Sequence, residues 1–113
     1  MRGFQVAPAE LEAVLLLHPH IVDAAVIGVS FPGSDDELPR AYIVGRPTAE
    51  GAKLTEGEIR QYIAERLAKY KGLTGGVTFV DGIPKNASGK ILKKVLKEIS
   101  AKEIQAGMVR PKL

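Results

Sequence analysis

Two lysines share one loop, residues 83–92, with a proline and a glycine. Lys85 follows Pro84 and Lys90 follows Gly89, so a rigid residue precedes one ammonium group and a flexible residue precedes the other. A lysine on such a loop can present its ammonium group to a phosphate or a carboxylate as a mobile point charge. The loop therefore indicates a binding site for an anion.

The spacing differs from that of the phosphate-binding loop G-x-x-x-x-G-K-[ST]. Gly82 lies two residues too far from Gly89, and Ile91 stands where that loop has a magnesium-binding hydroxyl. A solvated basic helix face is the simplest alternative to an anion site. That face would be formed by Lys85, Lys90, Lys93, Lys94 and Lys97.

The loop resembles the last motif of the adenylate-forming superfamily, which contains acyl-CoA synthetases, luciferases and peptide-synthetase adenylation domains. That motif reads P-K-x-x-x-G-K, and Pro84, Lys85, Gly89 and Lys90 match it. The final lysine of the family's motif takes part in adenylation. The resemblance therefore implies that Lys90 is catalytic, with Pro84, Lys85, Ser88 and Gly89 as supporting residues of the motif.

A second resemblance lies at the other end of the chain. Residues 3–12 resemble the end of the glycine-containing loop beyond the superfamily's interdomain hinge, most closely in the coumarate–CoA ligase and luciferase branch. The resemblance implies that Gln5 contacts the adenylate and that Gly3 faces the channel for coenzyme A. Residues 22–29 also fit the family, whereas Asp36 stands in a surface turn where a glycine is common.

Together these resemblances imply the mobile C-terminal domain of an acyl-CoA synthetase, spanning residues 1–113, with a loose tail from residue 107. The full enzyme would use ATP, Mg²⁺ and coenzyme A to join a carboxylic acid to the CoA thiol. The domain's partner would be its own large N-terminal adenylation domain, preceding Met1. The fragment alone is expected to bind none of these cofactors and to be inactive.

The composition of the chain excludes several kinds of site and argues against other classes of protein. The chain has 113 residues, a net charge of +3 and no cysteine, which fits one small domain and excludes disulfides and thiolate chemistry. His18 and His20 are two potential metal ligands without a third nearby, so no metal site is predicted. No apolar run is long enough to span a membrane, and no secretory signal is evident. A nucleic-acid-binding or interaction module remains the rival, but aromatic residues make up only 5%.

The hydrophobic periodicity predicts an α+β domain in which helices pack on a small, roughly three-stranded sheet. A short hairpin piece is expected at residues 1–6. Thr55 starts a capping box and Ser88 is expected to cap the last helix. The expected elements are a helix from Ala7 to His18 with Glu10 and Glu12 near its start, strands at 22–29, 40–46 and 77–80, a helix from Thr55 to Gly72, and a helix from Ser88 to about Lys102, with turns between 47 and 53.

The last three residues carry one further signal. Pro111-Lys112-Leu113 resembles the serine-lysine-leucine type of peroxisomal address, with proline in place of the usual small residue. A peroxisomal location is therefore expected, and a cytoplasmic one otherwise.

Overall fold

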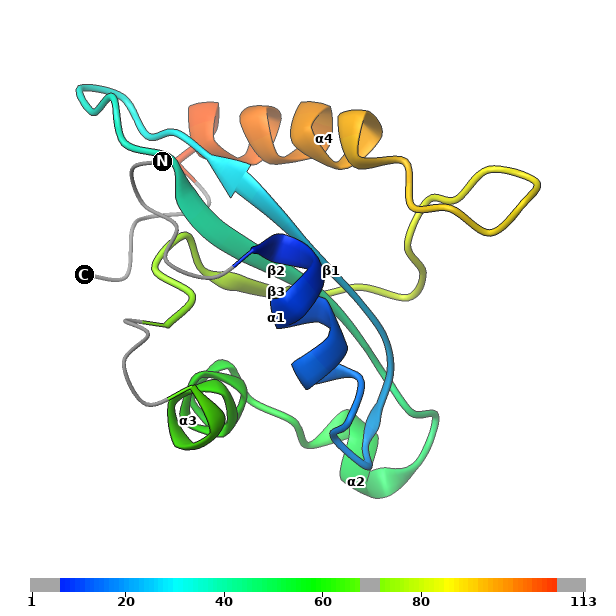
Figure 1. The fold of residues 1–113 in the computed structure, drawn as a ribbon. Coiled ribbons are helices and arrows are strands. Elements are labelled where there is room, and N and C mark those ends of the chain that lie inside the picture. The colour runs from blue at the N-terminus through cyan, green and yellow to red at the C-terminus, as the bar shows by residue number, and fades with distance from the viewer. Residues whose placement is uncertain (1–6, 68–71, 108–113) are drawn as a thin grey trace.

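The computed structural model describes residues 7–67 and 72–107 (Figure 1). The expected N-terminal hairpin piece and the loose end of the tail lie outside these residues. The described elements, in chain order, are α1 (Pro8–Leu15), β1 (Ile21–Val29), β2 (Leu38–Gly45), α2 (Ala49–Ala52), α3 (Glu56–Arg66), β3 (Val77–Phe79) and α4 (Lys93–Gln105).

The three strands form one mixed sheet in the order β1-β2-β3. β1 pairs with β2 in antiparallel fashion, from Ile21 opposite Gly45 to Val29 opposite Leu38. β3 is short and runs parallel to β2, with Val77 opposite Ala41. The predicted α+β class and three-stranded sheet are confirmed, and β2 is the central strand.

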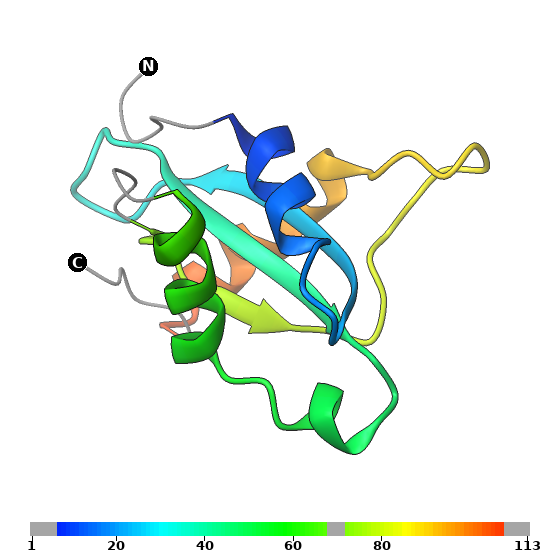
Figure 2. The same cartoon turned by 60° about the horizontal axis from the view of Figure 1, so that its bottom comes forward.

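Helices cover both faces of this sheet. Figure 2 shows α1 and α3 in front of the sheet and α4 behind it. Leu11 and Leu15 of α1 and Ile59 and Ile63 of α3 are fully buried in one hydrophobic cluster. Leu96 of α4 is buried in a second cluster on the opposite face. Burial of each such side chain stabilises the folded state by roughly 1.5–3 kcal/mol relative to exposure. The helices on both faces therefore stabilise the sheet.

The outer edge of β1 has no neighbouring strand in the described sheet, and side chains satisfy part of its backbone. The Val26 N–H donates to the Glu12 Oε2 of α1 at 2.8 Å. The Val26 carbonyl accepts from the Lys93 Nζ of α4 at 3.0 Å, and Lys93 also pairs with Glu12 at 2.9 Å. One ion pair thus joins the two helical layers across the edge and protects it from pairing with another strand.

Several element boundaries differ from the prediction, and α3 ends at Arg66 with Leu67 as its C-cap rather than at Gly72. α1 ends at Leu15 rather than His18, and tighter bonds such as Leu17 N–H to the Val14 carbonyl follow it. β2 begins at Leu38 and includes Pro39, whose carbonyl accepts from the Gly75 N–H at 2.8 Å. The segment expected as turns contains α2, because the Thr48 side chain caps its first turn.

The start of the last helix was also predicted wrongly. α4 begins at Lys93 after Leu92, and no side chain caps it. The Ser88 hydroxyl instead bonds to the side chain of Asn86, so Ser88 belongs to the preceding loop. Among the apolar side chains expected on one face of this helix, Leu96 is buried, but others are partly exposed to solvent. These exposed members are Leu92, Val95 and Ile99.

A buried polar network fixes the far end of α4 to the sheet. Arg40 of β2 is 2% exposed and donates to the Gly75 carbonyl at 3.2 Å, to the Thr78 hydroxyl and to Glu103 Oε1 at 3.2 Å. The Tyr42 hydroxyl donates to the same Glu103 oxygen at 2.8 Å. Burial raises the pKa of Tyr42 above its ordinary value, so the hydroxyl stays protonated and remains a donor near neutral pH.

Replacing Glu103 with alanine is expected to destabilise the domain by about 2–3 kcal/mol, because Arg40 and Tyr42 stay buried without their shared acceptor. Urea unfolding of the domain measures this loss. Glu98→Ala, at an exposed position of the same helix, is the control and should change stability by less than about 0.5 kcal/mol. Equal effects of the two substitutions would show that the network does not hold α4.

Candidate functional site

The predicted loop is a closed hairpin, here called the lysine arm (residues 84–91). Lys85 and Ile91 form an antiparallel bridge at its base. The Asn86 N–H donates to the Lys90 carbonyl at 2.9 Å, and the Leu92 N–H donates to the Pro84 carbonyl at 2.9 Å. Figure 1 shows the arm projecting beyond the sheet between β3 and α4. The backbone of Lys90 is therefore fixed to the base of the arm.

Asn86 organises the tip. Its Oδ1 accepts from the Ser88 N–H at 3.0 Å, the Ser88 hydroxyl at 2.7 Å and the Lys90 N–H at 3.0 Å. Gly89 closes the turn with a φ of +87°, a conformation that glycine adopts without the strain of a Cβ atom. Sequence reasoning missed Asn86, although asparagine is known to bond backbone groups two residues on and so to favour turns.

Apolar side chains seat the base of the arm. Ile83 and Ile91 are partly buried and pack against the cluster that contains Leu96 of α4. Val80, directly after β3, packs against the same cluster. The arm thus begins and ends on the core, while its tip from Asn86 to Lys90 is exposed.

The lysines at and after the arm differ in their partners. The Lys85 Nζ lies 2.5 Å from Asp23 Oδ2 of β1, and Lys93 pairs with Glu12. Lys90 has no ion-pair partner among the described residues and is exposed at the tip. The five lysines therefore do not form one solvated face. Two are neutralised at the sheet edge, and Lys90 offers an ammonium group to an external anion.

The histidine pair has an intramolecular role. His18 Nδ1 accepts from the His20 N–H at 3.0 Å, and its ring lies 4.7 Å from that of Tyr62. Burial, followed by the charge of His20, lowers the pKa of His18. Within residues 7–67 and 72–107, no cluster of three or more His, Cys, Asp or Glu side chains could hold a metal ion. No helix in the same ranges could cross a membrane.

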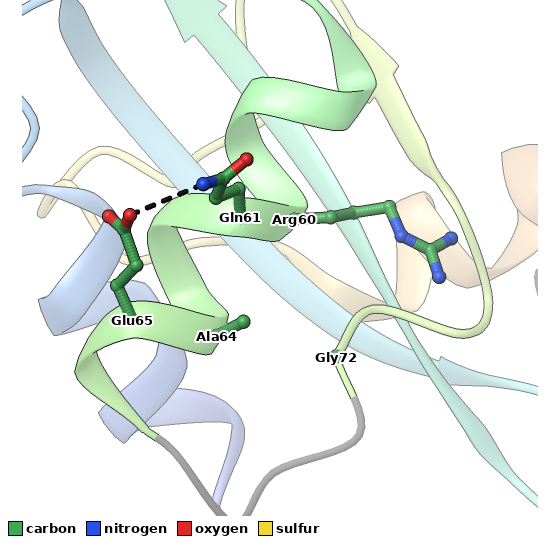
Figure 3. Close-up of a pocket in the computed structure, with 5 residues that line it drawn as sticks. All are labelled: Arg60, Gln61, Ala64, Glu65 and Gly72. Atoms are coloured by element: carbon green, nitrogen blue, oxygen red, sulfur yellow. Dashed lines mark hydrogen bonds between the residues drawn. The ribbon is translucent and has the colours of Figure 1, made fainter.

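Two hollows lie away from the arm tip. One, of about 530 Å³, lies on the outer side of α3, where Gln61 donates to Glu65 at 3.3 Å (Figure 3). Figures 1 and 2 both place α3 far from the arm. The other, of about 580 Å³, reaches Val80 and Asp81 just before the arm and includes the half-exposed side chains of Val22 and Phe79. Neither contains a residue of the lysine arm.

Comparison with known proteins identifies the family. The family model of the AMP-binding enzyme C-terminal domain matches residues 10–90. A phenylacetyl-CoA ligase of Aspergillus niger is 55% identical over 98 residues, which cover 87% of this chain and 17% of the relative. A probable 4-coumarate–CoA ligase of Dictyostelium discoideum is 46% identical over 99 residues, covering 88% of the chain and 17% of the relative.

The solved structures agree. A fatty acyl CoA synthetase of Mycobacterium tuberculosis superposes with a TM-score of 0.74 at 37% identity, over 89% of this chain and 19% of that chain. The chain belongs to the AMP-binding enzyme C-terminal domain family. It spans 17% of the length of the two ligases described above. Gly3 and Gln5 lie outside the described residues.

Asn86→Ala is expected to loosen the arm tip without unfolding the domain, because it removes three hydrogen bonds from an exposed turn. Backbone ¹⁵N relaxation should show increased motion at Ser88 and Lys90, and the unfolding free energy should change by less than about 1 kcal/mol. Ser88→Ala removes only the bond made by the hydroxyl, so it should leave Lys90 ordered. An equally ordered tip in Asn86→Ala would contradict the role given to Asn86.

Proposed function

We propose that this chain is the mobile C-terminal domain of an ATP-dependent carboxylate–CoA ligase, in which Lys90 serves the adenylation step. The observation that carries the proposal is the exposed Lys90 at the tip of an ordered arm, without an ion-pair partner among the described residues. The membership of the chain in the AMP-binding enzyme C-terminal domain family supports the proposal. Relatives named as acyl-CoA and coumarate–CoA ligases also support it.

In the first half-reaction, a carboxylate oxygen attacks the α-phosphorus of ATP and pyrophosphate leaves, giving an acyl-adenylate. The carboxylate and the α-phosphate bring negative charge together as they react. A preorganised ammonium group at that point stabilises the transition state more than the separated reactants. Lys90 is suited to this role because the arm fixes its backbone while its side chain extends into solvent.

In the second half-reaction, the thiol of coenzyme A attacks the acyl carbonyl and AMP leaves. Rotation of the domain between the two steps would withdraw Lys90 and bring the N-terminal segment to the site. Gly3 would then face the pantetheine channel, and Gln5 would contact the adenylate. These two roles rest on the resemblance of residues 3–12 to the family's loop.

The remaining binding residues would lie in the partner domain upstream. The lysine arm offers ammonium and amide groups, which fit phosphate and carboxylate oxygens and do not fit Mg²⁺. Mg²⁺ would therefore be bound through the phosphates of ATP and upstream carboxylates. The nucleic-acid-binding alternative is not favoured, because Lys85 and Lys93 are paired with acidic residues.

Lys90→Ala in the full-length ligase is expected to lower acid-dependent ATP–pyrophosphate exchange by about two to three powers of ten. Thioester formation from a supplied acyl-adenylate should be largely preserved, because the ammonium group serves the first step. Isotope exchange and a coupled CoA assay measure the two half-reactions separately. An equal loss in both would indicate a structural role for Lys90.

Gly3→Leu is the contrasting variant, because the leucine side chain would obstruct the proposed channel for the thiol of coenzyme A. It should reduce thioester formation while leaving exchange mostly intact. The isolated domain is the second control and should neither hydrolyse ATP nor form a thioester. Turnover by the isolated domain would contradict the assignment to an incomplete active site.

We also propose that Pro111-Lys112-Leu113, where it forms a free C-terminus, directs import into peroxisomes. The support is its match to the lysine-leucine ending of that signal class. A fluorescent protein that ends in residues 102–113 should enter peroxisomes in eukaryotic cells. Removal of Leu113 should abolish import, and a diffuse signal with the intact tail would defeat the proposal.

A further inference from the structure

We propose that Asp23 is a positioning residue for Lys90 and that it acts through its ion pair with Lys85. This inference rests on the function proposed for Lys90 above. Asp23 lies on β1, far from the arm in sequence, in the segment 22–29 that fits the family but outside the two motifs at residues 3–12 and 84–90. Its side chain nevertheless meets the base of the lysine arm, where Lys85 pairs with Ile91.

The Asp23 carboxylate is itself fixed. Its Oδ1 accepts from the Ala24 N–H at 2.9 Å, and its Oδ2 lies 2.5 Å from the Lys85 Nζ. The pairing of β1 with β2 is irregular between Ile21 and Asp23, and such an irregularity redirects the adjoining side chain. One carboxylate therefore satisfies a backbone donor of β1 and holds a lysine of the arm.

The ion pair that restrains Lys85 also restrains Lys90, because Asn86 connects the two residues. Lys85 is followed by Asn86, whose N–H donates to the Lys90 carbonyl and whose Oδ1 accepts from the Lys90 N–H. Of the polar side-chain contacts within the described ranges, the Asp23–Lys85 pair is the one that joins the arm to the sheet. The apolar seat of Ile83 and Ile91 fixes the base of the arm, but it supplies no directional contact.

The same pair also sets the charge of the arm. Asp23 neutralises Lys85, whose side chain is 37% exposed against 22% for Asp23. Lys90 is then the one arm lysine without an ion-pair partner among the described residues. An incoming phosphate or carboxylate consequently meets one positioned ammonium group rather than two competing ones.

The experiment uses the full-length ligase with Asp23→Asn, Lys85→Gln and the double variant. Asparagine keeps an acceptor for the Ala24 N–H and removes the charge that holds Lys85. Each single variant is expected to lower kcat for ATP–pyrophosphate exchange on the order of tenfold, because a small displacement of a catalytic group is costly. Thioester formation from supplied acyl-adenylate and the KM for ATP should change less than twofold.

Non-additivity distinguishes positioning from direct binding. If Asp23 acts through Lys85, the double variant loses no more exchange activity than either single variant. If Lys85 itself binds the substrate, Lys85→Gln impairs exchange while Asp23→Asn leaves it unchanged or raises it, and the proposal is overturned. In the Lys90→Ala background, Asp23→Asn should add no further loss.

Two controls separate the possible failures. Glu103→Ala weakens the opposite end of α4, so it should lower stability at least as much as Asp23→Asn and still leave exchange near the parent value. An equal loss of exchange in Glu103→Ala would overturn the positioning role in favour of general destabilisation.

If Lys90→Ala keeps normal exchange, the proposed function fails. If Lys90→Ala loses exchange while Asp23→Asn and Lys85→Gln keep it, this inference alone fails.

Discussion

The arrangement of this domain depends on one constraint, the outer edge of β1, which has no neighbouring strand among the described residues. A strand edge exposes N–H and C=O groups that must be bonded to water, to another chain or to side chains. Here Asp23 bonds the Ala24 N–H, and Glu12 and Lys93 bond the two sides of Val26. The same carboxylates hold Lys85 and Lys93, which lie just inside and just after the lysine arm. Satisfying the edge therefore also fixes where the arm leaves the core.

Order at the tip of the arm comes from polar contacts rather than from burial. Its tip is exposed and cannot gain stability from the hydrophobic effect, so Asn86 supplies three acceptor bonds and Gly89 supplies the turn. Water can replace each of these bonds at an exposed tip, so the three together contribute less than about 1 kcal/mol to the free energy of unfolding. Such a tip limits the positions of the Lys90 backbone, although it is held less firmly than the buried core.

The fold was largely predictable because its signals are local. The helix start predicted at Thr55 was correct, as the bond from the Glu58 N–H to the Thr55 hydroxyl shows, although the Glu58 carboxylate accepts from the Thr55 hydroxyl. Apolar runs predicted the strands. Lys90 was selected only through its match to the family's motif, and its catalytic role stays a prediction. The Asp23–Lys85 ion pair at the base of the arm was not predictable, because it joins segments that are distant in sequence. A charged residue within the apolar run 22–29 was the one local anomaly that pointed to Asp23.

In the proposed ligase, a small domain that acts on a large partner domain would face opposing requirements, and the charges of this chain meet both. A cluster of unpaired lysines would attract phosphates strongly, but it would also bind them without orientation and would repel itself in the folded state. Pairing Lys85 and Lys93 with carboxylates removes that repulsion and uses both pairs to bind α4 and the arm to the sheet. The single ammonium group left at the tip is weak as a binding site alone, which would suit the proposed role of Lys90, since that role is needed only while a partner domain holds the substrates.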